Sequence, residues 1–80
     1  MKPYILTRTT LSEEKERIKA DQKHKTERHK YPFRLYDDDG ELYYKGLSVE
    51  NNSFEPLYAE QPNSGVTEIH YLNNGKWEHL

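Results

Sequence analysis

The sequence predicts an α+β protein: a small antiparallel β-sheet built from two β-hairpins, with an N-terminal helix. Asp37 to Gly40 separates two runs rich in Leu and Tyr, and Asn73 to Gly75 separates two further runs of β-forming residues. Aspartate or asparagine followed by glycine between such runs is a strong hairpin signal. The charged segment before the first hairpin opens with a helix-capping pattern. The length of 80 residues favours one small domain, residues 1–80.

Composition limits both the core and the kinds of site. Apolar residues make up 32% of the chain, charged residues another 32%, and the mean hydropathy is −1.21. An enclosed cavity for a sizeable ligand is therefore not expected. The absence of cysteine excludes disulfides and thiolate–zinc sites. No apolar run reaches membrane-spanning length and no signal-peptide pattern follows the first residues, so we expect a cytoplasmic protein with no membrane partner.

Charge is unevenly divided along the chain. Residues 1–30 hold nine Lys or Arg and five Asp or Glu, a net charge of +4. Residues 31–80 hold three Lys or Arg and nine Asp or Glu, a net charge of −6. We therefore distinguish a basic strand-and-helix arm (1–30) from an acidic, tyrosine-rich hairpin body (31–80). Such asymmetry indicates the kind of partner rather than the fold.

The first 30 residues predict a strand and then a helix. Residues 4–10 are rich in β-formers and predict one strand of the sheet. Thr10 and Glu13 have the spacing of a capping box, and opposite charges four residues apart follow, so a helix is expected from Leu11 to Arg28. Because only Leu11 and Ile18 share an apolar side, the first two turns should dock on the sheet and the second half should project or fray.

The first hairpin leaves two registers open. A two-residue turn at Asp39-Gly40 pairs Leu35 with Tyr44, whereas a three-residue turn with a glycine bulge pairs Leu35 with Tyr43. Whether Leu42 and Tyr44 join the core depends on this choice. Under either register, five side chains are expected in the core: Phe33, Leu35, Ile69, Tyr71 and Trp77.

The last third of the chain predicts a loop and the second hairpin. Residues 47–65 contain recurring Asn, Pro and Gly turn signals and are expected to form a long surface loop. Phe54, Leu57 and Tyr58 should anchor that loop on the sheet. Residues 66–72 and 76–80 are then expected to pair as strands around the turn at Asn73 to Gly75.

The acidic run at residues 37–39 with Glu41 raises the question of a calcium loop. An EF-hand loop with its glycine at Gly40 would place Leu35 at position one and Gly46 at position twelve, where oxygen ligands are needed. The pattern therefore fails, and we interpret the run as a solvated hairpin turn.

The four histidines do not complete a metal site. His24 and His29 are five residues apart and would point to different faces of a helix. His70 and His79 face each other if the second turn has two residues, but two ligands fall short of the three or four of a zinc site. No metal or cofactor is predicted.

Catalysis has no support in the sequence. The serines at positions 12, 48, 53 and 64 lie in polar, turn-like contexts without a neighbouring histidine–acid pair. The carboxylates lie on turns and expected solvent faces. We therefore expect a non-enzymatic protein with no catalytic residue.

Tyrosine is abundant, with seven residues in a chain whose core is thin. Tyrosine gives large contact area with few rotors to freeze, and interfaces favour it for this reason. With carboxylates interspersed, the interpretation is a small binding module that engages a protein partner through an acidic β-surface. The expected partner-binding residues are Tyr36, Tyr43, Tyr44 and Tyr58.

Two alternatives remain open. Cations of the basic arm could contact nucleic acid, because clustered cations can follow a phosphate backbone; these are Lys19, Lys23, Lys25 and Arg28. The acidic body could instead mimic nucleic acid and inhibit a protein that binds it.

Overall fold

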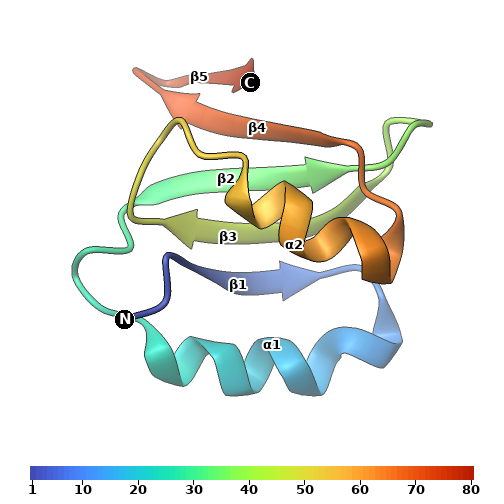
Figure 1. The fold of residues 1–80 in the computed structure, drawn as a ribbon, viewed down its shortest axis with the longest axis horizontal. Helices are drawn as coiled ribbons and strands as arrows, with labels where there is room; N and C mark the ends of the chain where they lie inside the picture. Colours follow the sequence, from blue (N-terminus) through green and yellow to red (C-terminus); the bar gives the residue numbers. More distant parts are fainter.

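The computed structural model describes all 80 residues and contains a five-stranded antiparallel sheet and two α-helices (Figure 1). The strand order is β1-β3-β2-β4-β5. The α+β class and the antiparallel sheet are thus confirmed, with hairpins β2–β3 and β4–β5 joined by the pairing of β2 with β4. The strands are β1 Tyr4–Thr9, β2 Tyr31–Tyr36, β3 Leu42–Ser48, β4 Glu68–Asn73 and β5 Lys76–His79.

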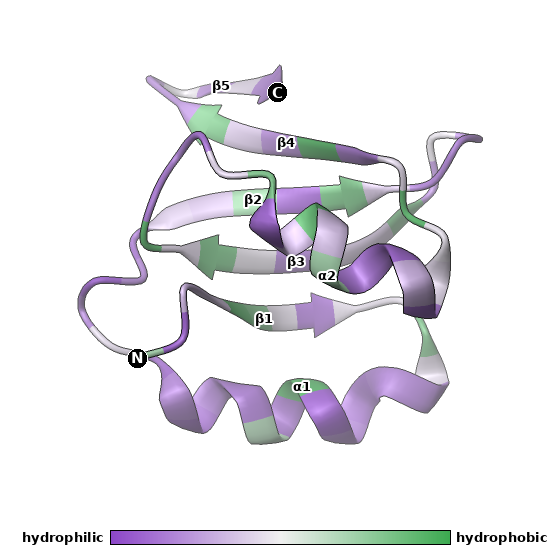
Figure 2. Ribbon diagram, in the orientation of Figure 1, coloured by the Kyte–Doolittle hydropathy of each residue, from purple (hydrophilic) through white to green (hydrophobic).

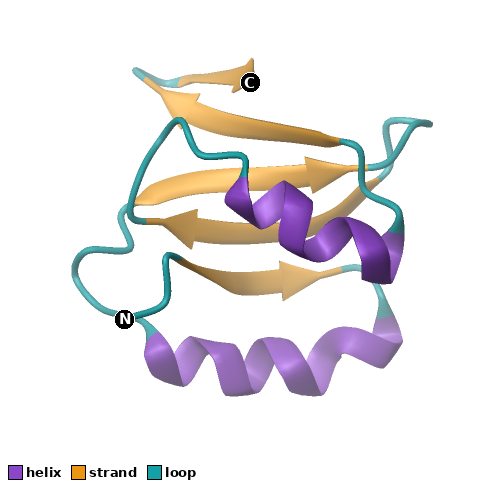
Figure 3. Ribbon diagram, in the orientation of Figure 1, coloured by secondary structure: helices purple, strands orange, loops and turns teal.

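The two helices occupy different positions against the sheet. Helix α2, Glu55–Ser64, crosses one face in front of β2 and β3, and α1, Lys15–Asp21, runs alongside β1 (Figures 1 and 3). Short 3₁₀ segments, η1 Ser12–Glu14 and η2 Gln22–His24, extend α1 at both ends. Neither helix is long and apolar enough to cross a membrane.

The helical segment ends four residues earlier than expected, and its end does not project. After His24 the chain turns back, because the Thr26 N–H donates to Nδ1 of His29 at 2.9 Å. His29 is buried, and its Nε2 lies 2.6 Å from the carbonyl oxygen of Lys2. The expectation that the second half would project was therefore wrong, since one buried imidazole ties the segment to the N-terminus. The alternative, that the helix would fray, agrees with its end at His24.

Helix α2 lies where a surface loop was expected, which corrects that prediction. Its start has Pro56 in the first turn, where a missing N–H costs nothing. Its end has Gly65 in the left-handed conformation, with φ 76° and its N–H bonded to the Gln61 carbonyl at 2.9 Å. These start and stop signals were present, but no clean apolar stripe connects them, as the mixed colouring in Figure 2 shows.

The first hairpin combines features of both expected registers. Its turn is closed by Asp37, whose N–H donates to the Glu41 carbonyl at 3.0 Å. A bulge then skips Tyr43, so that Leu35 pairs with Tyr44 as the two-residue turn required. The second hairpin has a two-residue type I′ turn at Asn74-Gly75, where φ is 52° and 80°.

The core lies between the sheet and α2. Side chains alternate along a strand, so cross-strand partners share a face. Four of the five expected core residues are buried on the α2 side: Phe33, Leu35, Ile69 and Tyr71. Trp77 was expected there too, but it pairs with Leu72 and lies half-buried on the opposite face. Strand β5 is an edge strand, and the register of its turn directs Trp77 away from α2.

Candidate functional site

One basic residue from each strand lies in a continuous line across the face turned away from α2, here called the open face. Arg8 pairs with Lys45, Lys45 with Arg34, Arg34 with His70, and His70 with His79. Figure 1 shows no helix behind β2, β4 or β5 on this side. We call these five residues the cationic row.

Alternation along β2, β3 and β4 places Arg34, Lys45 and His70 opposite the core, and a bulge between Leu6 and Arg8 brings Arg8 onto the same face. Arg34 lies between the buried Phe33 and Leu35, and His70 lies between the buried Ile69 and Tyr71. The three row members on β2, β3 and β4 are half-buried, whereas those on the edge strands are exposed. The row is therefore a surface feature that the core pattern and the bulge in β1 create together.

The permanent charges of the row have no acidic counterpart. Arg8, Lys45 and Arg34 take part in no salt bridge. The guanidinium of Arg34 lies 3.9 Å from the ring centroid of Trp77, a cation–π contact. Its Nε atom is buried and has no hydrogen-bond partner. Directly opposed like charges destabilise a sheet, so the pairing of Lys45 with Arg8 and with Arg34 carries a cost.

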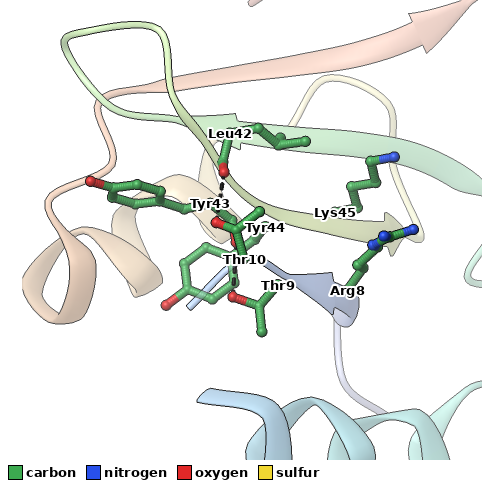
Figure 4. A pocket seen from close by; sticks show the side chains of 7 residues that line it. All are labelled: Arg8, Thr9, Thr10, Leu42, Tyr43, Tyr44 and Lys45. Atoms are coloured by element: carbon green, nitrogen blue, oxygen red, sulfur yellow. Dashed lines mark hydrogen bonds between the residues drawn. The ribbon is translucent and has the colours of Figure 1, made fainter. Parts of the chain in front are cut away.

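A shallow hollow of about 210 Å³ lies between β1 and β3 at the β1 end of the row. Arg8 and Lys45 line it at one side, where their side chains extend in the same direction (Figure 4). The hydroxyls of Thr9 and Thr10 are held on the backbone of β3, by bonds of 2.9 Å to the carbonyls of Tyr43 and Leu42. Two cations beside a hollow suit an anionic group such as a phosphate.

The four tyrosines expected to form one partner surface are not brought together. Tyr44 is only 1% exposed and faces the core, so it is not available to a partner. Tyr36 lies on the open face, where its ring centroid is 4.6 Å from that of His70. Tyr43 is the bulge residue, and a hydrogen bond to Asp37 raises the pKa of its hydroxyl. Tyr58 is on α2 and is 65% exposed.

Much of the tyrosine content serves the core instead of an interface. The hydroxyls of Tyr4, Tyr44 and Tyr71 donate to Glu60, Glu14 and the Ser53 carbonyl, at 2.7, 2.9 and 2.7 Å. Burial raises the pKa of all three phenols, and the neighbouring carboxylates raise those of Tyr4 and Tyr44 further. A tyrosine ring can fill the core while its hydroxyl binds a polar group at the core boundary.

The basic residues of the expected arm are all exposed, but they do not form one surface. Lys23 and Lys25 line a hollow beside the N-terminus together with His24. Arg28 lines a different hollow, which also contains acidic residues, and Lys19 lines neither. None of these four lies on the cationic row, to which the arm contributes only Arg8.

The expectation that His70 and His79 face each other across a two-residue turn is confirmed. Their rings stack with centroids 4.8 Å apart and planes 15° from parallel. Sequence reasoning missed Glu68 as a neighbour of His70. Residues two apart on a strand share a face, and this spacing was the signal that could have found it. In the structure Oε1 of Glu68 lies 3.1 Å from Nε2 of His70.

Comparison of this chain with family models, with curated proteins and with solved structures finds no match.

Proposed function

We propose that this chain is a small non-enzymatic binding module whose open face binds single-stranded nucleic acid. The observation that carries the proposal is the cationic row, in which each of the five strands contributes one basic side chain in register. A polyanion laid across the strands would offset the repulsion that these neighbours impose on one another. The overall charge of −2 attracts no polyanion, so binding would depend on the row.

The dimensions and the neighbours of the row support this partner class. Adjacent strands are about 4.8 Å apart, so the four gaps span roughly 19 Å, enough for several nucleotides. Tyr36 and Trp77 lie on the same face beside Arg34 and His70. Aromatic rings next to cations on an open sheet suit unpaired bases, which stack on rings while the phosphates contact the charges.

The test is fluorescence anisotropy with short random-sequence RNA and DNA single strands over a range of salt concentrations. The triple variant Arg8→Gln, Arg34→Gln, Lys45→Gln removes the permanent charges of the row. We expect weaker binding. The slope of the logarithm of the binding constant against the logarithm of the salt concentration should be shallower by roughly two units, at about 0.7 unit for each lost phosphate contact. The double variant Arg8→Gln, Lys45→Gln leaves the Arg34–Trp77 contact in place and should give an intermediate loss.

The matched control removes three charges elsewhere, by Lys19→Gln, Lys23→Gln and Lys25→Gln. This control should retain most of the affinity and the salt dependence of the unmodified chain. If it lost binding while the row variant kept it, the basic arm would be the interface and the proposal would be wrong. No binding of either nucleic acid at low salt would also refute it.

A protein partner is the second candidate, and one observation favours it. Phe54 and Tyr58 form an exposed stacked pair on the outer side of α2, 39% and 65% exposed, with centroids 5.7 Å apart. Exposed aromatic pairs are typical of protein-binding surfaces. Two results together would support this candidate. The chain would bind no nucleic acid, and the substitutions Phe54→Ala and Tyr58→Ala would abolish its binding to a purified protein partner.

A further inference from the structure

We propose that Glu68, His70 and His79 form a binding site for a divalent transition metal, with Zn²⁺ as the best-suited ion. Glu68 and His70 are two residues apart on β4 and share the open face, and His79 lies directly opposite His70 on β5. The three side chains therefore converge at the β5 end of the sheet. The site shares His70 and His79 with the cationic row and would use their neutral imidazoles, but its ligand is a metal ion, so its test needs no nucleic acid.

The spacing of the three ligand atoms is close to that of a tetrahedral site. Ligands about 2.0–2.2 Å from a zinc ion lie roughly 3.3 Å from one another. Oε1 of Glu68 is 3.1 Å from Nε2 of His70 and 3.8 Å from Nδ1 of His79. All three atoms lie within 4.8 Å of one another. Bonding geometry requires one of the two imidazoles to turn out of the stack, because parallel rings direct their nitrogen lone pairs in parallel planes.

The side chains differ in how freely they can make that adjustment. His79 is 57% exposed and next to the C-terminus, so its ring can turn out of the stack. His70 is 23% exposed and is held between the rings of Tyr36 and His79. One ligand is thus positioned in advance, and the most exposed one completes the site.

The chemistry of the donors selects the class of metal. Two imidazoles and one carboxylate are a recurrent zinc set with three protein ligands, which leaves a fourth position for water. Imidazole suits Zn²⁺, Ni²⁺, Cu²⁺ and Co²⁺, whereas Mg²⁺ and Ca²⁺ prefer oxygen ligands. The competing explanation is a hydrogen-bonded surface cluster, in which Glu68 pairs with His70 and no ion is bound. It predicts no metal affinity.

The experiment is isothermal titration of the full chain with ZnCl₂, with MgCl₂ as the comparison. We expect one Zn²⁺ per chain and no measurable Mg²⁺ binding. In His79→Gln the Zn²⁺ affinity should be at least roughly tenfold lower, because the loss of a group that only hydrogen-bonds a metal ligand already costs that much. The control His24→Gln removes an exposed histidine outside the site and should bind Zn²⁺ as the unmodified chain does.

A second measurement does not depend on any variant. In NMR spectra of the unmodified chain, substoichiometric Zn²⁺ should shift the imidazole signals of His70 and His79 before those of His24 and His29. Shifts confined to His24, or Zn²⁺ affinity that His79→Gln leaves unchanged, would overturn the proposal. Absence of Zn²⁺ binding would do the same.

Discussion

Gly46 illustrates how strongly a single position can depend on its neighbours. It lies in β3 between Leu6 of β1 and Phe33 of β2. A Cβ atom there would lie 2.4 Å from the Ile5 carbonyl oxygen and 2.4 Å from the Phe33 ring. The absence of a side chain lets the Phe33 ring lie directly over the strand, where it packs edge-on against Tyr4.

We predict that Gly46→Ala lowers the free energy of unfolding by about 3 kcal/mol, at the upper end of the cost of overpacking, because backbone has to move. Gly40→Ala is the control. Gly40 has φ 79° but open space around it, so only conformational strain of about 1 kcal/mol is expected. Urea denaturation measures both. Equal losses would show that β3 shifts without cost and that the close approach is unimportant.

At the scale of elements, α1 protects the free edge of the sheet. Strand β1 is an edge strand, and its outward N–H and C=O groups could pair with another chain. The carboxylate of Asp21 accepts the Leu6 N–H at 2.6 Å, and the Gln22 amide donates to the Thr7 carbonyl at 3.1 Å. Asp21 is buried and also binds the ammonium of Lys2. Two polar side chains of α1 and η2 thus replace a sixth strand.

We predict that Asp21→Ala lowers the free energy of unfolding by about 1–3 kcal/mol, since the buried Leu6 N–H would lose its acceptor. Asp21→Asn keeps an acceptor oxygen and loses only the charge, so it should cost less than half as much. Thermal or urea unfolding gives both values. If Asn were as harmful as Ala, the ion pair with Lys2 rather than the edge hydrogen bond would hold α1 in place.

At the scale of the whole molecule, Glu60 connects three elements. It lies on α2 and is fully buried, and its carboxylate accepts two hydrogen bonds from Arg17 of α1, at 2.5 and 2.8 Å. It also accepts the hydroxyl of Tyr4 of β1 at 2.7 Å. The bond to Glu60 raises the pKa of Arg17 above its already high value. A buried charge with these partners fixes how the two helices sit on the sheet.

The buried tyrosine hydroxyls that bind carboxylates predict a loss of stability at alkaline pH. Burial and the bond to Glu14 raise the pKa of Tyr44 to about 12 from 10.0, and burial and the bond to Glu60 raise that of Tyr4. The unfolded chain releases these protons near pH 10, so the stabilisation is complete below that pH and is lost as the pH rises through the folded values. Urea midpoints should therefore fall between about pH 9 and about pH 12.

Tyr44→Phe supplies the comparison for this pH dependence. It removes one phenol whose pKa is raised, so its stability should fall less steeply above pH 10 than that of the unmodified chain. Absorbance of tyrosinate follows the titration directly. A midpoint that is constant with pH would mean that these phenols ionise as easily in the folded chain as in the unfolded one.

The sequence by itself determined the features that depend on near neighbours. Asp and Asn before glycine produced both hairpins, and the β-formers of residues 4–10 produced β1. Helix α2 was missed because a proline start and a glycine stop carry little weight without an apolar stripe between them. Trp77 was placed wrongly because the face of a residue on an edge strand depends on register.

The tertiary structure alone decided the candidate sites. The row members are spread from Arg8 to His79 and come together only through four strand pairings. The bulge at Tyr43 sets the pairing of β2 with β3. It aligns Leu35 with Tyr44, and Lys45 therefore lies opposite Arg34. A slip of one residue in any pairing would turn a row member toward the core, and no property of a short segment determines that register.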